Sequence, residues 1–117
     1  MIDFEPPLGK HLMSTVVADF EKLNDKSLIL ESMIFAANKG GATIIHSYAH
    51  KFSPQGVTAF LLLAESHFAF HSWPEKETAC LDLFTCGDTA NCYEIHSTFL
   101  RCINARKRTW HVAPRIG

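Results

Sequence analysis

Hydrophobic residues occur in short runs along this chain, and proline, glycine or polar residues bound each run. Runs rich in β-branched and aromatic residues predict strands. The third run is almost wholly apolar, which is typical of a strand covered on both faces. The predicted strands are residues 12–20, 42–52, 57–64 with an extended continuation over 67–72, 78–85 and 109–113.

Two other segments repeat their apolar residues at helical spacing, which predicts helices over residues 27–38 and 91–105. Asn24 or Asp25 is placed to cap the first helix, and a glycine of Gly40-Gly41 supplies a left-handed exit. The residues expected on the buried side of the second helix are Tyr93, Ile95 or His96, Phe99, Leu100 and Ile103.

The predicted order of elements is β-α-β-β-β-α-β. Strands that follow one another through tight turns favour antiparallel pairing. The sequence therefore predicts an α+β fold, a two-layer sandwich of an antiparallel sheet with two helices on one face. The other face of the sheet still needs cover in so small a chain, so we expect a homodimer in which a second copy packs there.

Composition narrows the class of protein. The chain has 117 residues and a net charge of −1, which fits one globular domain over residues 1–117 and gives no reason to expect nucleic-acid binding. No apolar run is long enough to span a membrane, and the N-terminus lacks a signal sequence, so a cytoplasmic protein with reduced cysteines is expected. No cysteine or histidine spacing is typical of a zinc site, and no metal is predicted.

Chemistry-bearing side chains gather in the segment AESHFAFHSWPEKETACLDLFTCGD, residues 64–88. Ser66 is a polar residue at a bend, or it is the residue at which the chain cuts itself. In the second interpretation its hydroxyl attacks the carbonyl of Glu65, the resulting ester is eliminated, and a pyruvoyl group remains at position 66. Elimination needs a base for the serine α-proton, and histidine suits that role near neutral pH.

His71 is the candidate base for this step, with His67 as a rival. Residues 66 and 71 differ by an odd number, so a straight strand points their side chains to opposite faces. We therefore expect a bend or bulge between Ser66 and His71. A hydrogen-bonded histidine in a half-buried strand is the alternative interpretation of His71.

Cys86 lies at the end of an apolar strand, before Gly87, where it is either a small packing residue or a proton donor. A thiol with an ordinary pKa of about 8.5 is mostly protonated at neutral pH and can protonate a carbanion. Cys80 has the same strand parity and is a second candidate donor. Phe52, Trp73 and Glu75 can sandwich an adenine and bind ribose hydroxyls, or they belong to the core or a dimer contact.

The chain resembles the short bacterial and archaeal S-adenosylmethionine decarboxylases over nearly its whole length. The resemblance rests on GKHLMSTVVADF, GATIIHSYAHKFSPQGVTA, ESHFAFHSWPE and LDLFTCGD. It implies self-cleavage between Glu65 and Ser66 into a β chain, residues 1–65, and an α chain, residues 66–117. Ser66 becomes the pyruvoyl group that forms a Schiff base with S-adenosylmethionine, His71 is the processing base and Cys86 the proton donor.

The same resemblance implies substrate binding by Phe52, Trp73 and Glu75, and a product that donates an aminopropyl group in spermidine synthesis. Neither pyridoxal phosphate nor a metal is implied. Thr58, where the family often has serine, is expected to support processing by steadying the Glu65 carbonyl. Two alternatives remain at this point: a pyruvoyl-dependent arginine or ornithine decarboxylase, and an unprocessed homologue that serves as a binding subunit.

Overall fold

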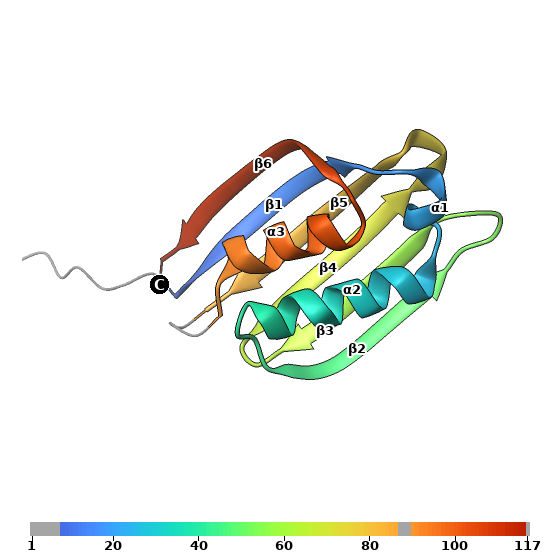
Figure 1. Ribbon diagram of the computed structural model, residues 1–117. Helices are drawn as coiled ribbons and strands as arrows, with labels where there is room; N and C mark the ends of the chain where they lie inside the picture. The colour runs from blue at the N-terminus through green and yellow to red at the C-terminus, as the bar shows by residue number, and fades with distance from the viewer. Residues whose placement is uncertain (1–7, 87–89, 117) are drawn as a thin grey trace, which may run out of the picture.

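The fold is a single six-stranded antiparallel sheet with its helices on one face (Figure 1). The computed structural model describes residues 8–86 and 90–116, and Gly87, the expected exit of a strand, lies outside these ranges. The strand order across the sheet is β2-β3-β4-β5-β1-β6. The elements are β1 (Gly9–Val17), α1 (Phe20–Leu23), α2 (Lys26–Lys39), β2 (Ile44–Lys51), β3 (Val57–Leu63), β4 (Ser66–Trp73), the 3-10 turn η1 (Pro74–Lys76), β5 (Thr78–Thr85), α3 (Cys92–Cys102) and β6 (Arg106–Arg115).

This architecture confirms the predicted α+β class, with α2 and α3 on one face of the sheet. The residues that begin and end α2 are also among those predicted from the sequence. The side chain of Asp25 accepts a hydrogen bond from the Leu28 amide, 3.0 Å away, and begins α2. Gly41, with φ 83°, supplies the left-handed exit after α2.

The predicted order lacked one strand. Residues 57–72 are not one extended segment but two antiparallel strands, β3 and β4, joined by a tight turn at Ala64-Glu65. The turn contains no glycine or proline, so no local residue signal predicts it. Ser66 is consequently the first residue of a strand that immediately follows a hairpin turn.

Two predicted boundaries and one side chain also need correction. The first strand ends at Val17 rather than residue 20, because Phe20 begins the short helix α1. The last strand is longer than predicted because it pairs with β1 along almost its whole length. Tyr93, expected on the buried side of α3, is exposed.

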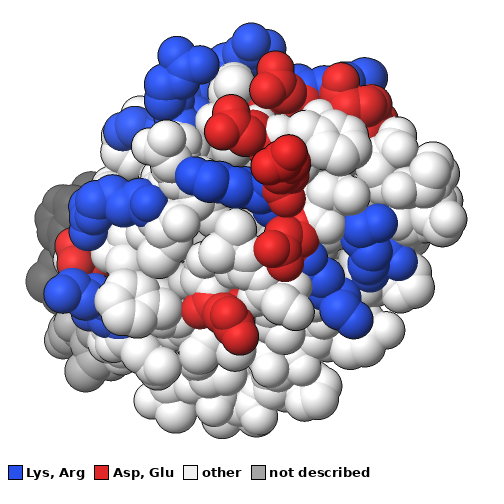
Figure 2. Space-filling model, turned by 45° about the vertical axis from the view of Figure 1, so that its right-hand side comes forward, with Lys and Arg blue, Asp and Glu red and all other residues white. Residues whose placement is uncertain are grey.

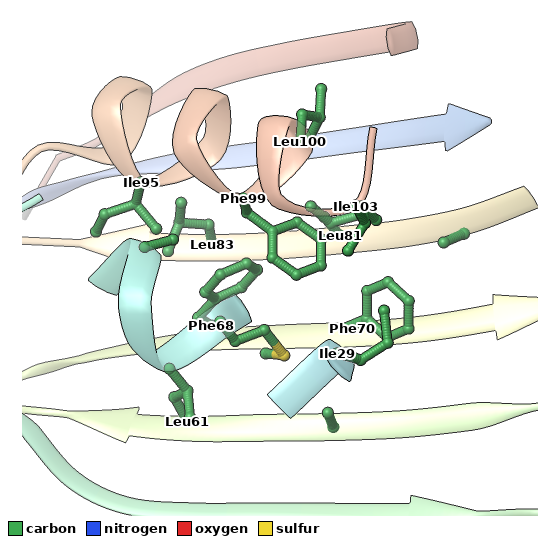
Figure 3. Close-up of a cluster of buried hydrophobic side chains, with 14 of the residues drawn as sticks. Ile29, Leu61, Phe68, Phe70, Leu81, Leu83, Ile95, Phe99, Leu100 and Ile103 are labelled. Carbon is green, nitrogen blue, oxygen red and sulfur yellow. The ribbon is translucent and has the colours of Figure 1, made fainter. Parts of the chain in front are cut away.

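The hydrophobic core fills the space between the helices and one face of the sheet (Figure 3). Phe99 of α3 packs edge to face against Phe68 and Phe70 of β4, with ring centroids 5.4 and 5.6 Å apart. Phe68, Phe70 and the alternate residue Ser72 point to this face, as does the side chain of Ser66. The core thus fixes which residues of β4 face the helices and which face away.

The other face of the sheet has no covering element among residues 8–86 and 90–116 (Figure 1). We call it the open face. It presents Phe60 and Leu62 of β3, which remain 39% and 43% exposed. Figure 2 shows acidic and basic side chains next to one another on the face in view, without a broad area of one sign. None of the helices in the described part of the chain is long and apolar enough to cross a membrane.

Candidate active site

The turn between β3 and β4 holds the peptide bond that the sequence analysis singled out. Glu65 adopts φ 59°, in the left-handed region that a residue with a side chain rarely occupies. Such a conformation costs on the order of 1–3 kcal/mol and persists only where the surroundings impose it. Here the pairing of Leu63 with Ser66 across the hairpin imposes it, so the backbone strain lies at Glu65, the residue before Ser66.

Cys86 contacts the two groups that would react during cleavage, the Glu65 carbonyl and the Ser66 hydroxyl. Its thiol donates a hydrogen bond to the Glu65 carbonyl oxygen, with 2.8 Å between sulfur and oxygen. Its backbone amide donates to the Ser66 hydroxyl oxygen at 3.1 Å, and its sulfur lies 3.5 Å from the same oxygen. The Ser66 side chain is buried, whereas Cys86 is half-buried and Glu65 exposed. We refer to Glu65, Ser66 and Cys86 as the cleavage cluster.

This geometry matches the requirements of an acyl shift. A donor on a carbonyl oxygen polarises the carbon for attack, as an oxyanion hole does. The Ser66 hydroxyl is the adjacent nucleophile, and the Cys86 amide fixes its oxygen. The residues present therefore fit the formation of a pyruvoyl group from Ser66.

His71 lies away from the cleavage cluster in the same protomer. The pairing of β4 with β3 and with β5 is continuous from Ser66 to Trp73, so the expected bend or bulge is absent and that prediction is wrong. Five residues of regular strand separate Ser66 from His71 by about 17 Å. Because their positions differ by an odd number, Ser66 faces the helices and His71 faces the open side.

His71 instead pairs with Thr58 of β3. The Thr58 hydroxyl and His71 Nδ1 are 3.0 Å apart, and the two residues are direct partners across the strands. Thr58 does not reach the Glu65 carbonyl within one protomer, since that carbonyl lies at the far end of β3. The hydroxyl orients the imidazole, and Nε2 has no hydrogen-bond partner within residues 8–86 and 90–116.

The expected substrate-binding residues lie at the His71 end of the sheet. Trp73 ends β4, Glu75 follows in η1, and Phe52 lies in the connection from β2 to β3 with its ring 4.6 Å from that of His50. All three are exposed. We refer to Thr58, His71, Phe52, Trp73 and Glu75 as the histidine end of the site.

Cys80, the rival proton donor, also lies at this end. It is the strand partner of His71, and both line an open hollow of about 460 Å³ that extends over β5 and β1 to Thr15 and His111. Cys80 is 3.9 Å from the Thr15 hydroxyl and belongs to β5, six residues before Cys86. It makes no contact with the cleavage cluster among the described residues, so Cys86 is the cysteine positioned at Ser66.

Sequence reasoning missed one polar cluster on the open face. His11 of β1, Asp82 of β5 and His67 of β4 bring their ligating atoms within 4.8 Å of one another. The strand alternation contained a signal, because Asp82 is a carboxylate within the apolar run TACLDLFT. His67, the rival base for Ser66, points its side chain to the opposite side of β4 from the Ser66 side chain.

Comparison with known proteins gives the family. Residues 10–116 match the family model described as S-adenosylmethionine decarboxylase. The S-adenosylmethionine decarboxylase proenzyme of Clostridium kluyveri is 38% identical over 103 residues, which cover 87% of this chain and 82% of that protein. The chain belongs to the S-adenosylmethionine decarboxylase family.

Two further relatives agree with this assignment. The proenzyme of Prochlorococcus marinus is 45% identical over 82 residues, which span 69% of this chain and 66% of that protein. The crystal structure of the adenosylmethionine decarboxylase from Aquifex aeolicus aligns with a TM-score of 0.88 at 30% identity, over 97% of this chain and 94% of that one. The predicted family and its reaction class, that of a carboxy-lyase, are thereby confirmed. The proenzyme names of the relatives imply a cofactor made from the chain itself.

Proposed function

We propose that this chain is a proenzyme that cuts itself between Glu65 and Ser66 and then decarboxylates S-adenosylmethionine. The product would be the aminopropyl donor of spermidine synthesis. One observation carries the proposal: Cys86 contacts both the Glu65 carbonyl oxygen and the Ser66 hydroxyl, at 2.8 and 3.1 Å. A structural turn needs neither contact, whereas both contacts assist an acyl shift between these two groups.

In this proposal, cleavage proceeds by rearrangement of the Glu65–Ser66 peptide bond. The Ser66 oxygen adds to the Glu65 carbonyl carbon, the carbon–nitrogen bond breaks, and the amine of residue 66 takes the hydroxyl proton. A base then removes the α-proton of residue 66, and the Glu65 carboxylate leaves, which gives dehydroalanine. Tautomerisation and addition of water release ammonia and leave the pyruvoyl ketone on the new α chain.

In the mature enzyme, the ketone supplies an electron sink for loss of CO₂ from an amino acid bound through its amine. Cys86 then acts as general acid. Its half-buried thiol lies beside residue 66, so it can deliver a proton to the former α-carbon of the substrate. A free thiol is required for this step, which fits the reducing cytoplasm as the proposed compartment.

The histidine end reaches the cleavage cluster only if a second copy supplies it. Two copies that pack their open faces together around a two-fold axis, with strands antiparallel, place the Ser66 end of one sheet over the His71 end of the other. The exposed Phe60 and Leu62 of the open face support this packing. Each site of the proposed homodimer then combines Ser66 and Cys86 of one copy with His71 and Thr58 of the other. The second copy's imidazole approaches the backbone α-carbon of residue 66 from the open face, opposite the Ser66 side chain.

The substrate assignment within the family rests on the histidine end. Phe52 and Trp73 present exposed aromatic planes on which adenine can stack, and Glu75 offers a carboxylate for ribose hydroxyls. An arginine or ornithine decarboxylase would have no use for a nucleoside pocket. A non-catalytic homologue would not need the contacts of Cys86.

Two assays of the purified protein test the proposed function. Ser66→Ala should give one uncut chain on a denaturing gel, whereas the native protein gives two. Release of CO₂ should be found with S-adenosylmethionine and not with arginine or ornithine. Trp73→Ala should raise the KM for S-adenosylmethionine by roughly tenfold or more, as expected for the loss of one stacking contact. Turnover of arginine in place of S-adenosylmethionine would overturn the substrate assignment.

A further inference from the structure

Three polar side chains meet on the open face in an arrangement that the decarboxylation does not use. His11, Asp82 and His67 come from β1, β5 and β4, and β5 lies between the other two strands. Each residue is half-buried. The three strands are hydrogen-bonded neighbours in the middle of the sheet, so their backbones hold the side chains at fixed positions.

The strand register explains why the two imidazoles converge on one carboxylate. His11 and His67 are both direct strand partners of Phe84, from opposite sides of β5. Asp82 points to the same face two residues before Phe84. Both rings lean along the strands toward Asp82: His11 Nε2 is hydrogen-bonded to Asp82 Oδ1, and His67 Nε2 lies 3.7 Å from the same oxygen.

Aromatic rings fix the plane of His67. Its imidazole is stacked between Phe60 and Phe84, with centroid distances of 6.0 and 6.1 Å and interplanar angles of 14° and 19°. Phe84 also meets His11 edge to face at 6.2 Å. The cluster is therefore preorganised, and little side-chain entropy remains to be lost on ligand binding.

A hydrogen-bonded pair alone explains His11 and Asp82 but not His67. At 3.7 Å, His67 Nε2 is too far from the carboxylate for a hydrogen bond, and it has no other partner within residues 8–86 and 90–116. Two ligands of a tetrahedral metal ion with bonds of about 2.0–2.1 Å are about 3.3 Å apart. The separation between His67 and Asp82 is thus close to that of two ligands sharing one ion.

We propose that His11, His67 and Asp82 bind one divalent transition-metal ion of the Zn²⁺ or Co²⁺ class. Two imidazole nitrogens and one carboxylate oxygen are a common ligand set for such ions, and they leave one coordination position open. The single negative charge of the set partly compensates the ion. The ion would link β1, β5 and β4 on the open face, on the opposite side of β4 from the Ser66 side chain, and it takes no part in the decarboxylation.

Metal titration of the full-length chain tests this site. The protein is made without a polyhistidine tag, stripped with chelator, and titrated with Co²⁺, whose visible absorption reports its ligands, and with Zn²⁺ by calorimetry. We expect one equivalent per chain, bound through nitrogen and oxygen, in the native protein and in uncut Ser66→Ala alike. The result is therefore independent of whether the protein decarboxylates S-adenosylmethionine.

Substitutions locate the ion. His11→Gln, His67→Gln and Asp82→Asn should each weaken Zn²⁺ binding at least 100-fold, whereas His46→Gln, an exposed histidine of β2, should leave it unchanged. Zn²⁺ binding that is unchanged in each of the three single variants would overturn the proposal. So would the absence of binding by the native protein, or a thiolate-to-cobalt absorption band in it. Absence of binding and a thiolate-to-cobalt band are both measured on the native protein. The proposal can therefore be refuted even if a variant fails to fold.

Discussion

Cys86 connects two stages of the proposed chemistry. In the uncut chain its thiol donates to the carbonyl of Glu65, and its amide donates to the hydroxyl of Ser66. After cleavage the same thiol is placed beside the new ketone, where a proton donor is required. In the proposed mechanism, one side chain that follows β5 thus serves both the formation of the cofactor and its use.

Cys86→Ala should separate these two stages. The Cys86 amide remains in the variant, so the Ser66 hydroxyl keeps its backbone donor and the chain should still be cut, though more slowly. Decarboxylation should fall by about 10²–10⁴-fold, as expected for the loss of a general acid. Band intensities on a denaturing gel over time and CO₂ release measure the two stages.

Cys102→Ala is the matched control, since Cys102 is a free thiol on α3 outside the site. It should leave cleavage and turnover unchanged. Normal CO₂ release by Cys86→Ala would contradict the assignment of Cys86 as proton donor.

His96 should make stability depend on pH. Burial, with a smaller contribution from the charge of Lys107, lowers the pKa of His96 to about 4. Its Nε2 is 2.8 Å from the Ser14 hydroxyl, and Trp110 stacks on its ring. The unfolded chain takes up a proton near the ordinary pKa of 6.5, whereas the folded chain does not until about pH 4. The free energy of unfolding should therefore fall by about 3 kcal/mol as the pH is lowered from 6.5 to 4.

Denaturant unfolding of His96→Gln checks this effect. Glutamine keeps a hydrogen-bonding group for Ser14 but cannot titrate, so the variant should lose this part of the pH dependence between pH 6.5 and 4. The exposed His111→Gln should follow the native protein. An identical pH slope in native protein and His96→Gln would refute the account.

At the scale of elements, the sequence predicts most of the fold because its signals are local. Asp25 caps α2, the apolar run over β5 has its predicted bounds, and helical spacing locates α3. The hairpin of β3 and β4 was missed because its turn, Ala64-Glu65, contains no residue that favours a turn. Pairing across the sheet imposes that turn, and such non-local pairing is invisible in a local pattern.

The close approach of α2 and α3 gives a prediction for this scale. Gly40 ends α2, its carbonyl accepts a hydrogen bond from the Asn91 amide, and a Cβ atom at Gly40 would lie 2.2 Å from Ile95 Cγ1. Gly40→Ala should therefore reduce the free energy of unfolding by about 1–3 kcal/mol through overpacking. Urea denaturation measures the loss, and Asn38→Ala, at an exposed position of the same helix, should change it by less than about 0.5 kcal/mol.

A double substitution tests the stated cause. Ile95→Ala removes the atom with which the new methyl group collides, so Gly40→Ala should cost less in the Ile95→Ala background than in the native chain. Equal costs in the two backgrounds would show that the helix junction has some other constraint.

At the scale of the whole molecule, the candidate site is divided between two ends of one sheet. The sequence identified its members but predicted that Ser66 and His71 meet through a bend in β4. The regular pairing of β4 excludes that bend, and the parity of the strand places the two side chains on opposite faces. Sequence spacing could not show this division. Residues that meet only between two copies of the chain need no particular spacing within one copy.

Co-expression of two inactive variants tests the shared site. Ser66→Ala lacks the cleavage residue, and His71→Ala lacks the base, so each alone should remain uncut. In a mixed dimer, one site combines Ser66 of the second variant with His71 of the first. About half of the His71→Ala chains should then be cut if chains pair at random, as read on a gel with chains of different tag length. An uncut mixture in which mixed dimers are present would contradict the division of the site between copies.

A charge on the open face should prevent assembly. Phe60→Lys places an ammonium group where the second copy is proposed to pack, so the chain should sediment as a monomer and remain uncut. Phe35→Lys, at an exposed position of α2 on the helical side, should remain a dimer in analytical ultracentrifugation. A Phe60→Lys protein that stays dimeric and is cut normally would place the interface elsewhere.

The central claim is that the chain breaks at the peptide bond between Glu65 and Ser66, and intact mass spectrometry of the freshly purified native protein tests it most directly. The account predicts two chains, residues 1–65 and a second that begins at position 66 with a pyruvoyl group in place of serine. That second chain should gain the mass of a hydrazone on treatment with a hydrazine. A single unmodified species of 13.1 kDa, stable over days and inert to hydrazine, would contradict it.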